Sequence, residues 1–254
     1  MIKKQLFRNI LWGFKNWMLS KMNLKSQLSS GITIKIENYA DWTIFNDIFV
    51  EGEYDLAIKY ALNSAENRRC LKFLDLGANV GFFTLRLADL ILKSENKSTD
   101  FEVVMIEGSH KVYHELRSRL MNESILNNKV KIVHGLVGER QGKGKIIESA
   151  FHVTNSVISD NNFSGTEVDY LDVMELYQEK DEIDLLKCDI EGAEQLFIEN
   201  YQEFLSKKVK SAIFELHHDK CNTDKCVKLL KNLGFTNHQK LRECSIFSVD
   251  FFWK

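Results

Sequence analysis

The segment FLDLGANVG, residues 73–81, decides the fold. Its first residues form an apolar strand that leads through Asp75 into a glycine-containing turn. The residues after the turn have the apolar pattern of a helix. In open α/β sheets, ligands bind in the crevice beyond such a strand end. Because glycine has no Cβ, Gly77 and Gly81 allow the backbone to approach a ligand closely. The alternative reading of the two glycines alone is an ordinary strand-to-helix turn.

The same alternation of strands and helices continues along the chain, without proline or an internal repeat. Near-continuous apolar strands separated by helices predict an α/β fold with a mostly parallel, seven-stranded sheet covered on both faces, a Rossmann-like arrangement. A short connector joins the last two strands and therefore predicts an antiparallel hairpin at the sheet edge. We expect strands at 71–76, 101–106, 130–134, 183–188, 209–216, 235–239 and 245–252, and helices at 80–92, 109–121, from about 193, and at 220–233.

The end of the second strand supports a nucleoside ligand. Glu107 is placed there, and a carboxylate at this point can accept both hydroxyls of a ribose. NAD enzymes usually carry G-x-G-x-x-G, whereas this chain has D-x-G-x-x-x-G. S-adenosylmethionine carries an amino group and a sulfonium, which suit an acidic loop. We therefore predict an S-adenosylmethionine site formed by Asp75, Gly77, Ala78, Asn79, Gly81, Phe82, Glu107, Gly108, Ser109, Leu136 and Asp189.

Polar residues also gather at the ends of the fourth and fifth strands. Alternation places Lys187 and Asp189 on one side of one strand, and Glu215 and His217 on one side of the other. These four are the predicted catalytic residues. His217 and Asp189 are candidate bases, with His217 ahead because an ordinary imidazole has a pKa of about 6.5. Alternatively, Asp189 and Glu215 hold a divalent cation such as Mg²⁺, which would lower the pKa of a bound hydroxyl.

In these segments the chain resembles the FkbM-type methyltransferases. The matching stretches are FLDLGANVGFFT, VVMIE, YLD, IDLLKCDIEGAE and IFELH, in order between about 71 and 218, with EGEY at 51–54 as a lead-in. The K-x-D-x-E-G-A-E block is the specific one. Tyr170 and Cys188 depart from the usual Thr and Ile, and residues 1–30 lie outside the resemblance. The resemblance implies a class I methyltransferase fold and O-methylation, often of sugars in polysaccharide or secondary-metabolite pathways.

Several polar residues also have structural interpretations. Glu191 and Glu194 stand at a helix start, where the helix dipole favours acids, and Asp172 fits a capping acid. His134, at a strand end, is more simply a hydrogen-bonding residue than a base. Of the neighbours His217 and His218, only one can face the cleft.

The composition narrows the class of protein. The 254 residues carry a formal net charge of −2, so no overall field favours nucleic acid as a partner. The 5 cysteines are irregularly spaced and form no CxxC pair, which indicates reduced thiols and a cytoplasmic protein rather than a disulfide framework or zinc site. No run is long and apolar enough to span a bilayer.

The N-terminal segment reads as an addition to the enzyme domain. We expect residues 1–65 to form an amphipathic helix and lead-in with a strand at 32–36, and residues 66–254 to form the methyltransferase domain. Residues 139–168 are expected to be strand extensions and a loop over the site. The helical spacing of Leu6, Ile10, Phe14 and Trp17 favours packing on the protein itself or on a second copy, giving a homo-oligomer. A helix on a membrane surface is the alternative.

These expectations combine into one function. The sequence predicts an S-adenosylmethionine-dependent O-methyltransferase whose small-molecule acceptor is a carbohydrate hydroxyl, on a nucleotide-activated sugar or polysaccharide precursor. The alternatives are a lipid, peptide or small-amine acceptor, and a cofactor-binding module without catalysis. A nicotinamide oxidoreductase is disfavoured by the glycine spacing.

Overall fold

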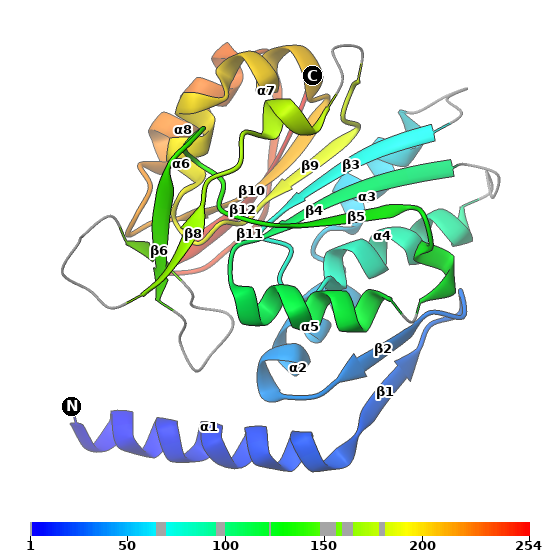
Figure 1. The fold of residues 1–254 in the computed structure, drawn as a ribbon, viewed down its shortest axis with the longest axis vertical. Coiled ribbons are helices and arrows are strands. Elements are labelled where there is room, and N and C mark those ends of the chain that lie inside the picture. The colour runs from blue at the N-terminus through cyan, green and yellow to red at the C-terminus, as the bar shows by residue number, and fades with distance from the viewer. Residues whose placement is uncertain are drawn as a thin grey trace.

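In the computed structural model, one seven-stranded sheet runs in the order β11-β12-β10-β9-β3-β4-β5 (Figure 1). The structure describes residues 2–64, 70–94, 100–121, 123–147, 156–158, 165–177 and 181–254, and the side chains of 2–10, 147 and 156–158 are not among the described parts. The strands of this sheet are β3 (Cys70–Leu76), β4 (Asp100–Glu107), β5 (Val130–His134), β9 (Leu185–Cys188), β10 (Ser211–His217), β11 (Asn237–Glu243) and β12 (Phe247–Trp253).

The strand directions confirm the predicted topology. β5, β4, β3, β9 and β10 are parallel, while β12 pairs antiparallel with both β10 and β11 at the edge. From β3 the chain passes to β4 on one side, and β9 later pairs on the other side of β3. The carboxyl ends of β3 and β9 therefore flank the switch point where ligands bind in such sheets.

Alternating residues of the strands enter two separate cores. Phe73, Leu185 and Ile213 pack with helices α3 (Asp55–Asn63), α4 (Phe82–Lys93) and α5 (His110–Leu120). Their neighbours Leu74 and Phe214 face the opposite core, with α6 (Glu194–Asn200), α7 (Gln202–Lys208) and α8 (Thr223–Asn232). Figure 1 shows these two helical layers on opposite faces of the sheet. Covering both faces explains why the strands are apolar throughout.

Helix and strand ends lie within a few residues of the predicted ones. β5 matches its prediction, whereas α4 starts at Phe82 instead of residue 80 because Gly81 adopts a left-handed φ of 88° just before it. Ile183 makes only an isolated bridge with Val209, so β9 starts at Leu185. Short 3₁₀ helices lie at Ser124–Leu126 and Val173–Leu176, and Asp172 caps the second by accepting from Met174 N, in agreement with its capping interpretation.

The segment 139–168 differs from the prediction of strand extensions and a loop. Strands β6 (Lys143–Ile147), β7 (Ser156–Ile158) and β8 (Thr166–Asp169) form a separate antiparallel sheet in the order β7-β6-β8. Ile146 and Val168 bury against Leu136, which gives this sheet a small apolar core of its own. Residues 148–155 and 159–164 of the segment lie outside the described residues.

The N-terminal addition packs along one side of the enzyme fold (Figure 1). It consists of α1 (Ile2–Met22), a hairpin of β1 (Leu24–Gln27) and β2 (Thr33–Ile36), α2 (Tyr39–Phe45) and a π-helical turn at Asn46–Val50. The predicted strand at 32–36 is confirmed, but its partner β1 was not predicted. Arg119 of α5 joins the addition to the sheet domain, because its Nη2 lies 2.7 Å from the buried Asp41 Oδ2 and its Nη1 donates to Lys35 O at 3.0 Å. Among the described residues, no helix has the length and apolarity needed to cross a bilayer.

Candidate active site

The glycine loop after β3 is shaped by protein packing. Gly77 has a φ of 69°, and a Cβ on it would lie 1.7 Å from the carbonyl oxygen of Asp189. Gly81 has a φ of 88°, and a Cβ there would lie 2.8 Å from Leu116 Cδ1. Both glycines are therefore required by the neighbouring β9 end and by α5. This reason differs from the close approach to a ligand that the sequence suggested.

Glu107 ends β4 beside this loop. Its Oε2 accepts from Asn79 N at 2.9 Å and its Oε1 accepts from Ser109 N at 2.8 Å. Burial raises the pKa of Glu107, and the two amide hydrogen bonds oppose that rise. The carboxylate is thus fixed in one orientation at the edge of a cavity, with further lone pairs on both oxygens.

A cavity lies at this switch point. It is lined by Gly77, Asn79, Ile106, Glu107, Gly108, Ser109, Gly135, Leu136, Val137, Ile146, Asp189, Ile190 and Glu191. Seven of the residues predicted for the cofactor are among them: Gly77, Asn79, Glu107, Gly108, Ser109, Leu136 and Asp189. Ala78 and Phe82 line a second cavity instead, and Asp75 and Gly81 line neither.

Asp75 is fully buried behind the loop. Thr84 Oγ1 donates to its Oδ2 at 3.3 Å, and its Oδ1 lies 3.4 Å from Lys187 Nζ. The same ammonium lies 3.4 Å from Asp189 Oδ2 and donates to Gly77 O at 2.9 Å. Burial alone would lower the pKa of Lys187, but Asp189 and Asp75 raise it. Lys187 is therefore a fixed cation that connects β9 to the glycine loop.

The second cavity adjoins the first, since Asn79, Asp189 and Glu191 line both. Its walls come from the N-terminal addition, the glycine loop, the ends of β9 and β10, and the terminal hairpin. They are formed by Thr43, Ile44, Asp47, Ile48, Glu53, Tyr54, Ala78, Asn79, Val80, Phe82, Phe83, Lys187, Asp189, Glu191, Glu215, His217, Asp219, Lys220, Arg242, Ile246 and Phe247.

His217 points into this second cavity from the end of β10. Its Nδ1 lies 3.2 Å from Glu194 Oε1, while its Nε2 lies 3.5 Å from Glu191 Oε2 and 3.7 Å from Glu215 Oε1. Burial alone would lower the pKa of His217, but the hydrogen bond and charge of Glu194 raise it to about 9, helped by Asp189 and Glu191. The imidazole is therefore charged at neutral pH, which removes the premise for preferring it as the base.

Glu194, His218 and His134 have structural contacts near the site. Glu194 accepts from Ile190 N and Gly192 N, both at 3.0 Å, so it serves the helix start and the histidine together. His218 is exposed and lies 3.5 Å from Glu243 Oε1, which confirms that only one of the two histidines faces the cleft. His134 Nε2 lies 2.9 Å from Gly108 O, as expected for a structural hydrogen bond.

Glu53 and Arg242 were missed by the sequence reasoning. The Glu53 side chain is only 8 % exposed, and its Oε2 lies 3.3 Å from Arg242 Nη1. Its Oε1 has no hydrogen-bond partner among the described residues, and burial raises the pKa of Glu53 to about 7. Burial and the charge of Asp189 also raise the pKa values of Glu191 and Glu215. The EGEY stretch was a signal for Glu53, although only as a family feature.

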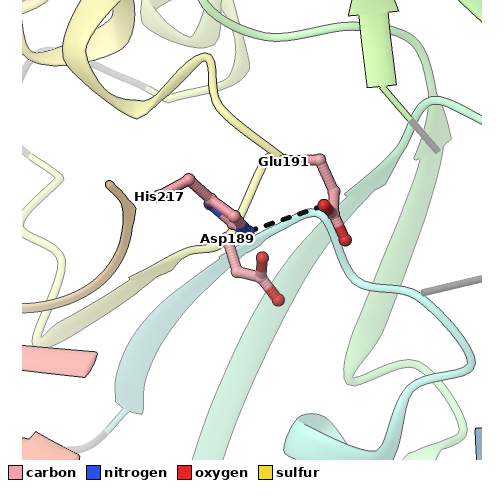
Figure 2. A group of neighbouring side chains, drawn as sticks. All are labelled: Asp189, Glu191 and His217. Atoms are coloured by element: carbon pink, nitrogen blue, oxygen red, sulfur yellow. Dashed lines mark ion pairs between the residues drawn. The ribbon is translucent and has the colours of Figure 1, made fainter. Parts of the chain in front are cut away.

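One group of side chains has the spacing of a metal site. Ligand atoms of Asp189, Glu191 and His217 lie within 4.8 Å of one another, and Figure 2 shows the three converging, with the His217–Glu191 ion pair dashed. The sequence suggested Asp189 with Glu215, whereas Glu191 and His217 complete this group. Because Glu194 holds Nδ1, Nε2 is the ring nitrogen directed at Glu191.

With this geometry in view, the sequence comparison identifies the family. Residues 75–242, more than half of the chain, match the family model described as the methyltransferase FkbM domain. The chain belongs to the FkbM methyltransferase family. The match includes the glycine loop, Glu107 and the ends of β9 and β10. The search of curated proteins found no match to this chain.

Solved structures give more distant likenesses. Methyltransferase FkbM from Methylobacillus flagellatus KT is 16 % identical with a TM-score of 0.48, covering 98 % of this chain and 60 % of that one. The chain thus spans 60 % of the length of that relative. The human methyltransferase 10 domain containing protein is 10 % identical with a TM-score of 0.46, covering 83 % of this chain and 91 % of that one. Fibrillarin from Aeropyrum pernix, with bound S-adenosyl-L-methionine, is 11 % identical with a TM-score of 0.43, covering 79 % and 74 %.

Proposed function

We propose that this FkbM-family protein transfers a methyl group from S-adenosylmethionine to a hydroxyl of a carbohydrate-type acceptor. The observation that carries the proposal is the junction of the two cavities at Asn79, Asp189 and Glu191. A donor in the first cavity and an acceptor in the second would meet there. In-line displacement requires this kind of fixed juxtaposition.

The residues of the first cavity suit S-adenosylmethionine, which supplies a sulfonium methyl group for displacement. Glu107 offers lone pairs for the ribose hydroxyls, and Asp189 offers negative charge to the sulfonium and the amino group, with the Glu191 carboxyl beside it. Asn79 Oδ1 is buried without a hydrogen-bond partner among the described residues, so it is a ready acceptor for an ammonium. Asp75 would act indirectly, through Lys187.

We propose Asp189 as the group that receives the hydroxyl proton. Its carboxylate lines both cavities, and Lys187 holds its Oδ2 at 3.4 Å. His217, charged at neutral pH, would instead donate from Nε2 to an acceptor oxygen. Glu215, whose pKa is raised by burial, would take part as a protonated acid that donates a second hydrogen bond.

Polar groups in the second cavity support a polyhydroxyl acceptor. The carboxyl groups of Glu53 and Glu215 can each accept from a sugar hydroxyl through an oxygen that carries no proton, and Tyr54 and Phe247 offer aromatic surface to the sugar ring. For a nucleotide-activated sugar, Lys220 and Arg242 are the cations available to phosphate. A lipid, peptide or small-amine acceptor is the second candidate, favoured by the apolar wall of Ile44, Ile48 and Ile246 and others.

A metal-dependent version of the reaction uses the group in Figure 2. Asp189, Glu191 and His217 would hold a divalent cation, which would supply Lewis-acid chemistry that lowers the pKa of an acceptor hydroxyl. The two hard carboxylate ligands fit Mg²⁺ or Mn²⁺. For this the imidazolium must first lose its Nε2 proton, while Nδ1 keeps the proton that it donates to Glu194.

The test uses two measurements on the full chain. S-adenosylhomocysteine should raise the melting temperature while NAD does not, because a ligand that binds only the native state stabilises it. Nucleotide-activated sugars, lipids and peptides are then screened for a mass gain of one methylene. A shift with NAD alone, or methylation of only non-carbohydrate acceptors, would contradict the proposal.

The unpaired cysteines support a cytoplasmic location for the protein.

A further inference from the structure

Helix α1 presents an apolar stripe to solvent. Leu11, Phe14, Met18 and Met22 follow one another at spacings of three and four residues, with Trp17 beside them. Their exposed fractions are 43 %, 56 %, 39 % and 52 %, and Trp17 is 60 % exposed. Soluble proteins rarely leave such contiguous apolar surface uncovered. The stripe therefore needs a partner outside the fold.

Other side chains of α1 hold the helix on the protein. Leu19 is 6 % exposed, Asn16 Oδ1 accepts from Tyr39 N at 3.0 Å, and Lys15 Nζ donates to Tyr39 Oη at 3.1 Å. Phe14 and Trp17, predicted to pack on the protein or a second copy, thus face outward on this chain. The side chains of Leu6 and Ile10 lie outside the described residues. Figure 1 shows α1 along the outer side of the molecule.

Charge decides which partner fits. Between residues 2 and 22 the sequence has five cations and no acid: Lys3, Lys4, Arg8, Lys15 and Lys21. The whole chain has 34 basic and 36 acidic residues, so the remainder has 29 and 36, a net charge of −7 against +5 on α1. A two-fold dimer through α1 would place the same cationic patch against itself. An anionic surface complements it.

We propose that α1 binds in the plane of a membrane containing anionic lipids. An amphipathic helix with aromatic residues in its apolar face and basic residues beside them inserts that face at the boundary between headgroups and acyl chains. Its lysines and arginine are attracted by the negative surface potential, an attraction that salt screens. This inference is independent of the methyl-transfer chemistry.

Vesicle co-sedimentation of the full chain tests the proposal, with phosphatidylcholine vesicles with and without 30 mol % phosphatidylglycerol. Wild type should bind the anionic vesicles at least tenfold more tightly than the neutral ones, and added salt should weaken that binding. The double variant Phe14→Ser, Trp17→Ser should lose the binding. Met121→Ser, which changes a side chain outside α1 that is 72 % exposed, should retain it.

Three results would overturn the inference. The inference would be refuted if wild type did not bind anionic vesicles, or if it bound neutral vesicles equally well. A wild-type dimer that the double variant converts to a monomer, with no vesicle binding by either, would assign the stripe to a second copy. Melting temperatures of all variants should match, since the changed side chains are exposed.

Discussion

Glu194 Oε1 lies 3.2 Å from His217 Nδ1, and this contact sets the character of the site. Glu194 is itself held by Ile190 N and Gly192 N, so the ring is fixed through the start of α6. Nε2 is directed into the cavity beside Glu191 and Glu215. A histidine supported in this way stays charged at neutral pH and donates a hydrogen bond.

We expect Glu194→Gln to lower the pKa of His217 from about 9 toward the ordinary value of about 6.5. The amide retains shape but loses the charge that stabilises the imidazolium. An NMR titration of the histidine ring protons measures this. Glu199→Gln, at a half-buried position of the same helix outside both cavities, should leave the value near 9. An unchanged pKa in Glu194→Gln would show that Asp189 and Glu191 maintain the charge.

His217 should also make stability depend on pH. Its folded pKa of about 9 lies above the unfolded value of about 6.5. The contribution is therefore fully present below pH 6.5, decreases between 6.5 and 9, and is absent above that. The free energy of unfolding lost in His217→Gln should be larger at pH 6 than at pH 10, by at most about 3 kcal/mol. Urea unfolding at the two pH values measures it, and an equal loss would contradict the shift.

The sequence was sufficient for the topology because buried parallel strands and their helices leave a periodic pattern. It also placed Asp189, Glu215 and His217 together, since the carboxyl ends of neighbouring parallel strands meet at one edge. The Glu53–Arg242 pair could not be predicted from the sequence, because the two residues are 189 positions apart along the chain. Glu194 escaped it because an acid that caps a helix and one that supports a histidine look the same in sequence.

Gly77→Ala should prevent folding or cost more than about 4 kcal/mol of unfolding free energy. The new Cβ would lie 1.7 Å from a backbone oxygen of Asp189, which no side-chain rotation relieves. Gly31→Ala is the matched control, because Gly31 has a φ of 94° and nothing within 4 Å of an added Cβ. It should lose only the about 1–2 kcal/mol of a left-handed alanine. If denaturant unfolding showed equal losses of unfolding free energy in the two variants, the left-handed backbone, and not the contact with Asp189, would be responsible for the loss.

Glu107→Ala should weaken S-adenosylhomocysteine binding by about 1–3 kcal/mol, because the ribose hydroxyls lose a charged acceptor. Asn79 N and Ser109 N also lose theirs, so the loop that lines the cavity is less ordered. Isothermal titration calorimetry gives the affinity, and circular dichroism confirms the fold. Glu107→Gln, which keeps one carbonyl oxygen, should have an affinity for S-adenosylhomocysteine between those of wild type and Glu107→Ala. Unchanged affinity in a folded alanine variant would remove Glu107 from the cofactor site.

Substitutions of Asp189, His217 and Glu191, together with removal of divalent cations, distinguish the three possible sources of acceptor activation. If Asp189 takes the proton, Asp189→Asn should reduce kcat by roughly 10²–10⁴, and His217→Gln by less. Because Asp189 lines both cavities, rates are compared at saturating cofactor, with S-adenosylhomocysteine affinity measured separately.

If His217 is the base, the order of the two effects on kcat reverses and the rate rises with pH through about 9. If a cation activates the hydroxyl, EDTA abolishes wild-type activity, added Mg²⁺ or Mn²⁺ restores it, and Glu191→Gln is impaired as well. Near-normal turnover in all three variants would place the chemistry elsewhere in the cavity.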